Sequence, residues 1–477
     1  MKVDRWNLFG ALVFAGVFGW IGAVFAADDN YADWPNSRNL LMNTTASGAN
    51  VATAQTGFPV LVRLAGANFP TGAKTDGTDI RFATSTGMHI PYQIERWDNV
   101  NSLAEIWVKA DVLGSNSTQY IVMYWGKADA ADSSSGSAVF DTANGFAGVW
   151  HLGETGNVDV QGYKDATLNA NHGTGYQTTG IEVPSVIGIG QNMTGTATAT
   201  LPGNLGLGCY IKIPDQVINI TAGTISMWVQ TPATFLTPNM DAFGSWNANN
   251  SRYFFGSDAA GKLRAMFGPS ANIATAYTFA PTTFYYIAMA WSGATTQIAK
   301  LYVNDTLHGT SNAVTQGAPT LINIGSFGSG YSDPWQGHVD ECRVDNVSRS
   351  ADYLKLCYES QKPGSSWISF QATSAKGITS QILPNVFGMQ ANSPGRFTGS
   401  MAIRYNLPEN ARVDLAIYNL QGGFVKRLVN AENKNAGSYD VVWNGRNEFN
   451  RTVANGSYIC RISTPGFVAS KVLILSR

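Results

Sequence analysis

Turn-forming residues divide this chain into short segments along its whole length. The 50 glycines are spread among many Asn, Ser and Thr residues, which leaves little room for long helical runs. Between the turns lie short runs rich in β-branched and aromatic residues, such as 58–64, 104–108 and 284–289, as expected for half-buried strands. Hydrophobic residues make up 44% of the chain, which supplies a core and excludes disorder. The sequence therefore predicts an all-β protein.

The charge content is low and balanced. Charged residues make up 13% of the chain, and 31 basic against 32 acidic residues leave a net charge of −1. Binding to nucleic acid needs a basic surface, and a solvating tail needs an excess of carboxylates. We therefore expect no nucleic-acid partner.

Residues 1–26 have the pattern of a signal peptide. Lys2 and Arg5 form a short positive region, residues 8–25 carry no charge, and Ala26 suits cleavage. The alternative is an uncleaved membrane anchor, because the apolar run approaches the length that spans a bilayer. Glycines within the run favour cleavage. Since no later stretch is apolar enough to cross a membrane, we expect the mature chain to be secreted or attached to the outer cell surface.

Four cysteines, Cys209, Cys342, Cys357 and Cys460, are available for disulfides in an exported protein. No C-x-x-C pair occurs, so a zinc ribbon or a redox pair is not supported. Cys460 lies far along the chain, and we expect one bridge among the other three. Free buried thiols are the alternative.

Shifts in composition divide the mature chain into three blocks and a linker. The blocks span 27–145, 146–370 and 395–477, and residues 371–394, with several Gly and Pro, form the linker. The one convincing helix is predicted at about 350–359, with Ser348 or Ser350 as its cap and Pro363–Gly364 after its end.

The first block contains Trp34 and the stretches 58–64 (FPVLVRL), 76–82 (DGTDIRF), 91–97 (PYQIERW), 106–109 (IWVK) and 124–126 (YWG). In these residues it resembles DUF2341, a domain family of unknown function found in bacterial exported proteins. It implies a β-sandwich domain and brings no established activity.

The second block contains the stretches 149–152 (VWHL), 165–174 (DATLNANHGT), 210–215 (YIKIPD), 224–229 (TISMWV), 300–304 (KLYVN), 324–326 (IGS) and 337–344 (GHVDECRV). In these stretches it resembles the laminin-G-like, concanavalin-A-like jelly rolls. The resemblance implies a jelly roll that binds glycans or proteins, often beside a calcium ion. The same fold also carries hydrolases and lyases.

The third block contains the stretches 403–409 (IRYNLPE), 413–419 (VDLAIYN), 437–439 (GSY), 442–445 (VWNG), 455–458 (NGSY) and 471–475 (KVLIL). In these stretches it resembles the immunoglobulin-like domains shared by the flagellar hook-capping protein and type IX secretion sorting modules. The resemblance implies a small immunoglobulin-like sandwich, with the outer-membrane secretion machinery as a partner.

No catalytic signature is present. The chain has no H-E-x-x-H, G-x-S-x-G or Walker motif, and its nearest acidic cluster is Asp340, Glu341 and Asp345. Neighbouring side chains point to opposite faces of a strand, so we expect Asp340 and Glu341 not to act as a pair. His151, in an apolar strand, is expected to be a core residue rather than a ligand. We expect no enzymatic activity.

The jelly-roll resemblance suggests calcium as a cofactor. By position in this fold, Asp165, Asn169, Asn171 and Asp340 are the candidate ligands, and their oxygen atoms suit calcium. The alternative is that Asp165 and Asn171 only shape a turn.

Two loops have the composition of a sugar-binding site, in which aromatic rings stack on sugars and short polar side chains bind hydroxyls. The candidate ligand-binding residues are Trp246, Asn247, Asn249 and Tyr253 in one loop and Tyr331, Trp335 and Gln336 in the other. The alternative is that the tryptophans close the ends of the hydrophobic core.

These patterns predict an exported or cell-surface protein that recognises a glycan or surface polysaccharide through its jelly roll. Two alternatives stay open at this point. One is a structural or adhesive protein with a protein partner, and the other is a carbohydrate-active hydrolase or lyase on the same scaffold.

The signal peptide gives a direct prediction. Because the charge-free run ends at Ala26, mass spectrometry of the exported protein should identify Ala27 as the first residue. A membrane-bound form that retains Met1 would contradict it.

Overall fold

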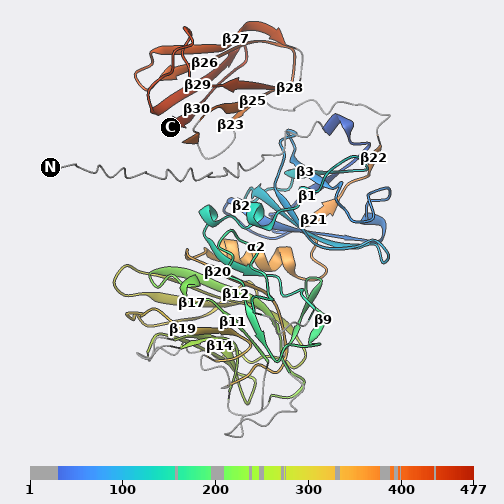
Figure 1. Cartoon of the computed structure of the whole chain (residues 1–477), viewed down its shortest axis with the longest axis vertical. Coiled ribbons are helices and arrows are strands. Elements are labelled where there is room, and N and C mark those ends of the chain that lie inside the picture. The colour runs from blue at the N-terminus through green and yellow to red at the C-terminus, as the bar shows by residue number, and fades with distance from the viewer. Residues whose placement is uncertain are drawn as a thin grey trace, which may run out of the picture.

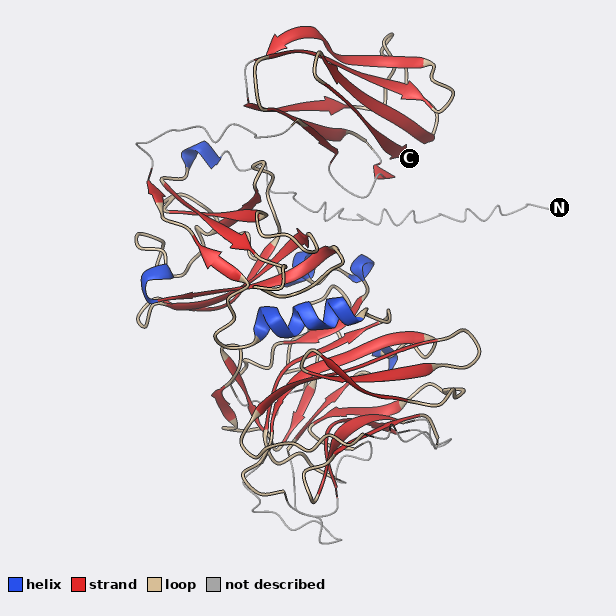
Figure 2. Ribbon diagram, turned by 180° about the vertical axis from the view of Figure 1, so that it is seen from behind, coloured by secondary structure: helices blue, strands red, loops and turns tan. Residues whose placement is uncertain are grey.

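The computed structural model describes residues 31–155, 160–194, 209–235, 239–246, 252–269, 273, 275–327, 333–375, 387–391, 396–397, 399–434 and 437–476. The predicted signal peptide lies outside these residues. The described part consists mainly of antiparallel strands, so the all-β fold class is confirmed (Figures 1 and 2). Among the described residues, no helix is long and apolar enough to cross a bilayer.

The first domain is formed by two sheets. One has the order β21-β1-β6-β3, with β22 also paired to β1, and the other has the order β2-β5-β4. The strands are β1 (Asn36–Met42), β2 (Gln55–Ala65), β3 (Arg81–Thr84), β4 (Tyr92–Asp98), β5 (Leu103–Val112), β6 (Tyr120–Trp125), β21 (Ile368–Phe370) and β22 (Ser374–Ala375). Short helices are η1 (Tyr31–Asp33), η2 (Gly66–Asn68), α1 (Gly136–Val139) and η3 (Thr142–Asn144).

The chain returns to the first domain after it has built the jelly roll. Phe370 of β21 pairs with Leu40 of β1, and Ser374 of β22 pairs with Ser37. The predicted boundaries placed β21 in the second block and β22 in the linker, because neither short strand differs in composition from its surroundings. Their pairing with β1 makes the jelly roll an insertion between β6 and β21.

The jelly roll contains an eight-stranded sheet and a six-stranded sheet. The larger has the order β18-β17-β16-β12-β20-β10-β9, with β7 also paired to β20, and the smaller has the order β15-β14-β13-β19-β11-β8. The larger sheet comprises β7 (Phe146–Trp150), β9 (Glu182–Pro184), β10 (Ile189–Asn192), β12 (Ala222–Gln230), β16 (Phe284–Ser292), β17 (Ile298–Val303), β18 (Thr306–Thr310) and β20 (His338–Asp345). The smaller sheet comprises β8 (Thr174–Tyr176), β11 (Tyr210–Ile213), β13 (Asn239–Trp246), β14 (Tyr253–Asp258), β15 (Leu263–Phe267) and β19 (Thr320–Ile324), and the short helix η4 (Asp215–Val217) follows β11.

Helix α2 (Ala351–Gln361) lies between the first domain and the larger sheet of the jelly roll (Figure 1). The helix prediction is confirmed, and the cap is Ser350, whose side chain accepts a hydrogen bond from Tyr353 N at 3.2 Å. Leu356 of α2 belongs to one hydrophobic cluster with Val60 of β2 and with Trp228 and Tyr286 on the outer face of the larger sheet. The two domains therefore share a core, and β16 is apolar on both faces because both faces are buried.

The four cysteines are free and buried, so the predicted disulfide is wrong. Cys209 and Cys342 belong to the inner core of the jelly roll, whereas Cys357 belongs to the core shared with the first domain. The larger sheet thus separates Cys342 from Cys357. Burial raises the pKa of the Cys209 and Cys357 thiols to about 11, which keeps them protonated and weakly reactive.

The third domain is a separate small sandwich with its own core around Ile403, Leu415 and Trp443. Its sheets have the orders β23-β25-β28 and β24-β30-β29-β26-β27. The strands are β23 (Gly388–Ala391), β24 (Arg396–Phe397), β25 (Met401–Leu407), β26 (Ala411–Asn419), β27 (Phe424–Lys434), β28 (Gly437–Trp443), β29 (Gly456–Thr464) and β30 (Phe467–Leu475). β23 lies within the predicted linker.

The shared core predicts that the first domain and the jelly roll unfold together. Leu356→Ala removes a fully buried side chain from this core and should lower the free energy of unfolding by about 2–5 kcal/mol. Calorimetry should show one transition for both domains shifted to lower temperature. Leu307→Ala, at a leucine that is 47% exposed, is the control and should change little. Separate melting of the two domains would contradict the shared core.

Candidate functional site

An irregularity in β20 is the starting point of the candidate site. Opposite β12, Arg343 pairs with Ser226 and Asp340 pairs with Trp228, so Glu341 and Cys342 together face Met227. This is a β-bulge. Glu341 has a φ of 50°, a left-handed conformation that costs a residue other than glycine about 1–3 kcal/mol.

The bulge turns Asp340 and Glu341 to the same face of the sheet. Cys342 points into the inner core of the jelly roll, whereas Glu341 contacts His151 and Asp340 accepts a hydrogen bond from Ile187 N at 2.8 Å. Ile187 itself lies in the core shared with the first domain. The expectation that Asp340 and Glu341 point to opposite faces is therefore wrong, because it assumed a regular strand.

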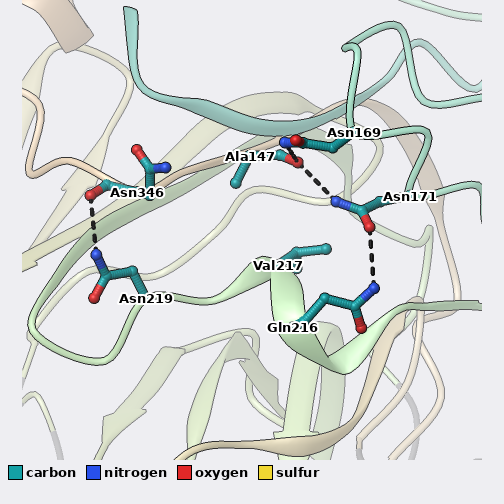
Figure 3. Close-up of a pocket in the computed structure, with 7 residues that line it drawn as sticks. All are labelled: Ala147, Asn169, Asn171, Gln216, Val217, Asn219 and Asn346. Atoms are coloured by element: carbon teal, nitrogen blue, oxygen red, sulfur yellow. Dashed lines mark hydrogen bonds between the residues drawn. The ribbon is translucent and has the colours of Figure 1, made fainter. Parts of the chain in front are cut away.

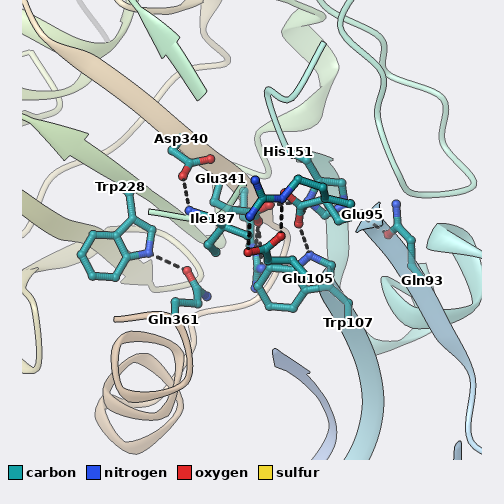
Figure 4. A network of polar contacts seen from close by, with 12 residues as sticks. Gln93, Glu95, Glu105, Trp107, His151, Ile187, Trp228, Asp340, Glu341 and Gln361 are labelled. Carbon is teal, nitrogen blue, oxygen red and sulfur yellow. Dashed lines mark hydrogen bonds and ion pairs between the residues drawn. The ribbon is translucent and has the colours of Figure 1, made fainter. Parts of the chain in front are cut away.

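Three side chains from the two domains converge beside the bulge (Figure 4). His151 and Glu341 come from the jelly roll, and Glu95 comes from β4 of the first domain. Glu341 Oε1 is in direct contact with His151 Nδ1, and Glu95 Oε2 lies 3.5 Å from the same nitrogen. One potential ligand atom from each residue lies within 4.8 Å of the other two. His151 is largely buried and hydrogen-bonded at both ring nitrogens, as expected for a core histidine, and it belongs to a polar cluster shared by the two domains.

Further contacts hold each of the three side chains in place. Gln93 Oε1 lies 3.1 Å from His151 Nε2, and Trp107 Nε1 donates to Glu95 Oε2 at 2.5 Å. Arg343 Nη2 donates to Glu341 Oε2 at 2.9 Å. The Trp107 ring stacks on the imidazole of His151, with centroids 6.0 Å apart, and the Arg343 guanidinium lies 4.3 Å from the centroid of the Trp107 ring.

Burial decides the electrostatics of the carboxyl groups. It raises the pKa of Glu95 well above its usual value, and the nearby charges of Glu341 and Asp340 raise it further. Burial also raises the pKa of Asp340, whose Oδ1 has no hydrogen-bond partner among the described residues. Burial opposes the ionisation of Glu341 too, but His151 and Arg343 outweigh it and lower the pKa of this group. The site thus combines an ionised carboxylate with one that tends to hold a proton.

The predicted sugar-binding residues have varied environments. Trp335 and Tyr253 are fully buried in the inner core, so the prediction that they face a ligand is wrong. Trp335 fills the core instead, with Nε1 donating to His338 O at 3.3 Å. Gln336 is half-buried. Asn247, Asn249 and Tyr331 lie outside the described residues.

Trp246 is half-buried at the end of β13. The Arg252 guanidinium lies 4.9 Å from its ring centroid, and Phe327 packs against it with centroids 5.7 Å apart. The loop of Trp335 meets β13 at Asp241, five residues earlier, which is about 17 Å along a strand. Trp335 therefore does not lie beside Trp246, and the two tryptophans do not form one surface.

The four predicted calcium ligands do not form one site. Both oxygens of Asp165 are engaged: Oδ1 accepts from Val149 N and Thr167 N, and Oδ2 accepts from Thr167 Oγ1 and Asn171 N, all at 2.8–2.9 Å. These bonds shape the turn, as the alternative interpretation proposed. Asp340 makes none of these contacts, and its Oδ2 accepts a hydrogen bond from Ile187 N instead. Binding of calcium stays a prediction.

Asn169 and Asn171 instead form the wall of a pocket of about 430 Å³ (Figure 3). Their side-chain nitrogens both donate to Ala147 O at 2.9 Å, and Gln216 Nε2 donates to Asn171 Oδ1 at 3.2 Å. The remaining lining residues are Val217, Asn219 and Asn346. The pocket is therefore lined mainly by uncharged amides.

The sequence interpretation missed Glu95, Trp107, Gln93, Gln216 and the role of His151. One signal was available in the charged residues that cluster on two predicted strands, where Glu95 precedes Arg96 and Glu341 lies between Asp340 and Arg343. A charge buried there needs partners. The pocket gave no such signal, since its amides come from separate turns.

Three family models match the chain. Residues 76–153 match DUF2341, a domain of unknown function, and residues 205–355 match the concanavalin A-like lectin/glucanases superfamily. Residues 390–465 match the FlgD Ig-like domain. The protein therefore combines a domain of each of these three kinds, as the resemblances predicted. Glu95, Trp107 and His151 lie in the first match, and Glu341 lies in the second.

Several solved structures align with parts of this chain. Domain 4 of AbnA, a GH43 extracellular arabinanase from Geobacillus stearothermophilus in complex with arabinotriose, is 18% identical, with a TM-score of 0.32, over 44% of this chain and 97% of that chain. The CBM40 of the Ruminococcus gnavus IT-sialidase, bound to α2,3-sialyllactose, is 16% identical, with a TM-score of 0.25, over 29% of this chain and 83% of that chain. The SAP-like pentraxin of Limulus polyphemus is 15% identical, with a TM-score of 0.23, over 28% of this chain and 69% of that chain. No curated protein matches the sequence.

The raised pKa of Glu95 predicts how stability depends on pH. The folded protein keeps this proton to higher pH than the unfolded chain, whose usual value is 4.5, so the free energy of unfolding should fall as pH rises above that value. Glu95→Gln cannot lose a proton there. In buffer with EDTA, urea denaturation from pH 5 to 8 should show that the free energy of unfolding of the variant rises relative to that of the wild type. The rise should be about 1.4 kcal/mol for each unit by which folding raises the pKa of Glu95. Glu409→Gln, at an exposed carboxyl, is the control. If the difference in free energy of unfolding between Glu95→Gln and the wild type stays constant from pH 5 to 8, the prediction is wrong.

Proposed function

We propose that this protein is an exported carbohydrate-binding protein and that the amide-lined pocket of the jelly roll is its glycan site. The observation that carries the proposal is the pocket itself. Its volume lies within the range of about 300–1,000 Å³ that is usual for ligand sites, and amide side chains line most of it.

The chemistry of the lining suits an uncharged sugar. Each amide offers both a donor and an acceptor, as each sugar hydroxyl does. Within the described part of the chain, the carbonyl oxygens of Asn169 and Gln216 and the whole side-chain amide of Asn346 make no hydrogen bond. These groups are available to a ligand, and all three residues are exposed.

Two exposed apolar side chains flank the pocket residues in sequence. Leu168, next to Asn169, is 71% exposed, and Val347, next to Asn346, is 38% exposed. Side chains of this kind pack against the C–H face of a sugar ring. Residues 205–355 match the concanavalin A-like lectin/glucanases superfamily, and this range includes Gln216, Asn219 and Asn346 of the pocket. The match supports the same proposal.

The proposal includes export by the predicted signal peptide and display at the outer surface through the immunoglobulin-like domain. It assigns binding without catalysis. An assay of reducing ends released from the bound glycan tests that part, and steady release would favour the hydrolase or lyase alternative.

The glycan site is tested with residues 27–477 on a glycan array, with and without calcium, followed by calorimetry on the best-bound glycan. Asn346→Ala and Gln216→Ala should each weaken binding by about 2- to 13-fold, the loss of one hydrogen bond of about 0.5–1.5 kcal/mol, at an unchanged melting temperature. Asn312→Ala, at an exposed asparagine away from the pocket, is the matched control.

A fourth variant separates the pocket from the predicted aromatic loop. Trp246→Ala should leave binding unchanged if the pocket is the glycan site. If Trp246→Ala abolishes binding and the pocket variants do not, the pocket assignment is wrong. If no glycan binds, the proposed function fails and an adhesive role with a protein partner becomes the better interpretation.

A further inference from the structure

His151 presents one ring nitrogen to two carboxyl groups. Its Nδ1 is in direct contact with Glu341 Oε1 and also faces Glu95 Oε2, and one N–H cannot serve two carboxylates equally well. A cation bound by all three side chains would replace the contact between His151 Nδ1 and Glu341 Oε1, and these two atoms would have to move apart to ligand spacing. The 3.5 Å between His151 Nδ1 and Glu95 Oε2 is close to the spacing of about 3.4 Å between two ligands of a tetrahedral ion with bonds of about 2.1 Å.

We propose that Glu95, His151 and Glu341 bind one divalent transition-metal ion, of the zinc or manganese class, at the junction of the first domain and the jelly roll. A nitrogen and two carboxylates form the donor set. Imidazole suits zinc and other transition metals, whereas calcium prefers oxygen ligands throughout. This site is therefore distinct from the calcium site that the sequence suggested.

The contacts around the three side chains match those found around metal ligands. Such a histidine usually donates its other ring N–H to an oxygen, and His151 Nε2 faces Gln93 Oε1 at 3.1 Å. Ligating carboxylates are themselves hydrogen-bonded, and here Trp107 holds Glu95 while Arg343 holds Glu341. His151 and Glu341 thus each bind an outer partner through one atom and direct the other atom at the common centre, whereas Trp107 donates to the same Glu95 Oε2 that faces His151 (Figure 4).

The bulge in β20 supports the same conclusion. A regular strand would turn Glu341 into the apolar inner core, and the left-handed φ of 50° is the backbone change that brings it out to His151. The side chains of His151 and Glu95 are 12% and 7% exposed, which gives an ion a route from solvent. A bound ion would link β4 of the first domain to β20 of the jelly roll.

The test uses the mature protein, residues 27–477, stripped with EDTA and dialysed against Zn²⁺ or Mn²⁺. Elemental analysis should find one ion per chain, and Co²⁺ should give visible absorption bands that Zn²⁺ removes. His151→Gln should bind no ion at this site. His308→Gln, at a half-buried histidine elsewhere in the jelly roll, is the matched control and should still bind one.

A second variant, with a smaller change, keeps the test valid if His151→Gln does not fold. Gln93→Ala removes only the outer partner of His151 and should weaken metal binding about 10- to 100-fold. Near-ultraviolet circular dichroism checks that each variant is folded. Failure of the folded wild type to bind either ion would overturn the proposal, as would equal binding by His151→Gln or, if that variant does not fold, by Gln93→Ala. Glycan binding plays no part in this test, so its outcome is independent of the proposed function.

Discussion

Strand β20 carries four ionisable side chains on a sheet face that the rest of the protein buries. Asp340, Glu341, Arg343 and Asp345 are each no more than 2% exposed. Burying a charge is costly unless a partner compensates for it. Arg343 is paired with Glu341, and Arg349, just before α2, is paired with Asp345 at 2.6 Å. The way the first domain and α2 cover this sheet depends on these pairs being complete.

The insertion of the jelly roll into the first domain keeps this arrangement together. The chain leaves the first domain after β6 and returns through α2 to β21, which pairs with β1. Both connections therefore join the same two bodies, and their apolar faces merge into one core. The shared core fixes the position of the two domains relative to each other, so Glu95 of the first domain is held beside residues of the jelly roll.

The protein thus has two candidate sites of different chemistry. The pocket near Asn169 and Asn346 is open, uncharged and lined by amides, as suits a neutral glycan. The cluster of Glu95, His151 and Glu341 is buried and charged, and its members come from both domains. The first site uses the jelly roll alone, whereas the second exists only because the two domains are packed together.

Local features were readable from the sequence because they depend on neighbouring residues. Turn residues and alternation indicated the strands, Ser350 and Pro363 marked the ends of α2, and the three domain types were recognised from their motifs. Which aromatic residues are buried was decided by tertiary packing, since Trp335 has the same polar neighbours in sequence as an exposed residue would have. The tertiary structure also decided that Asp340 and Glu341 share a face, because a bulge is set by pairing with β12 and leaves no mark in the strand's own composition. The contact between His151 and Glu341 joins residues 190 positions apart, and only the packing of the whole sheet brings such residues together.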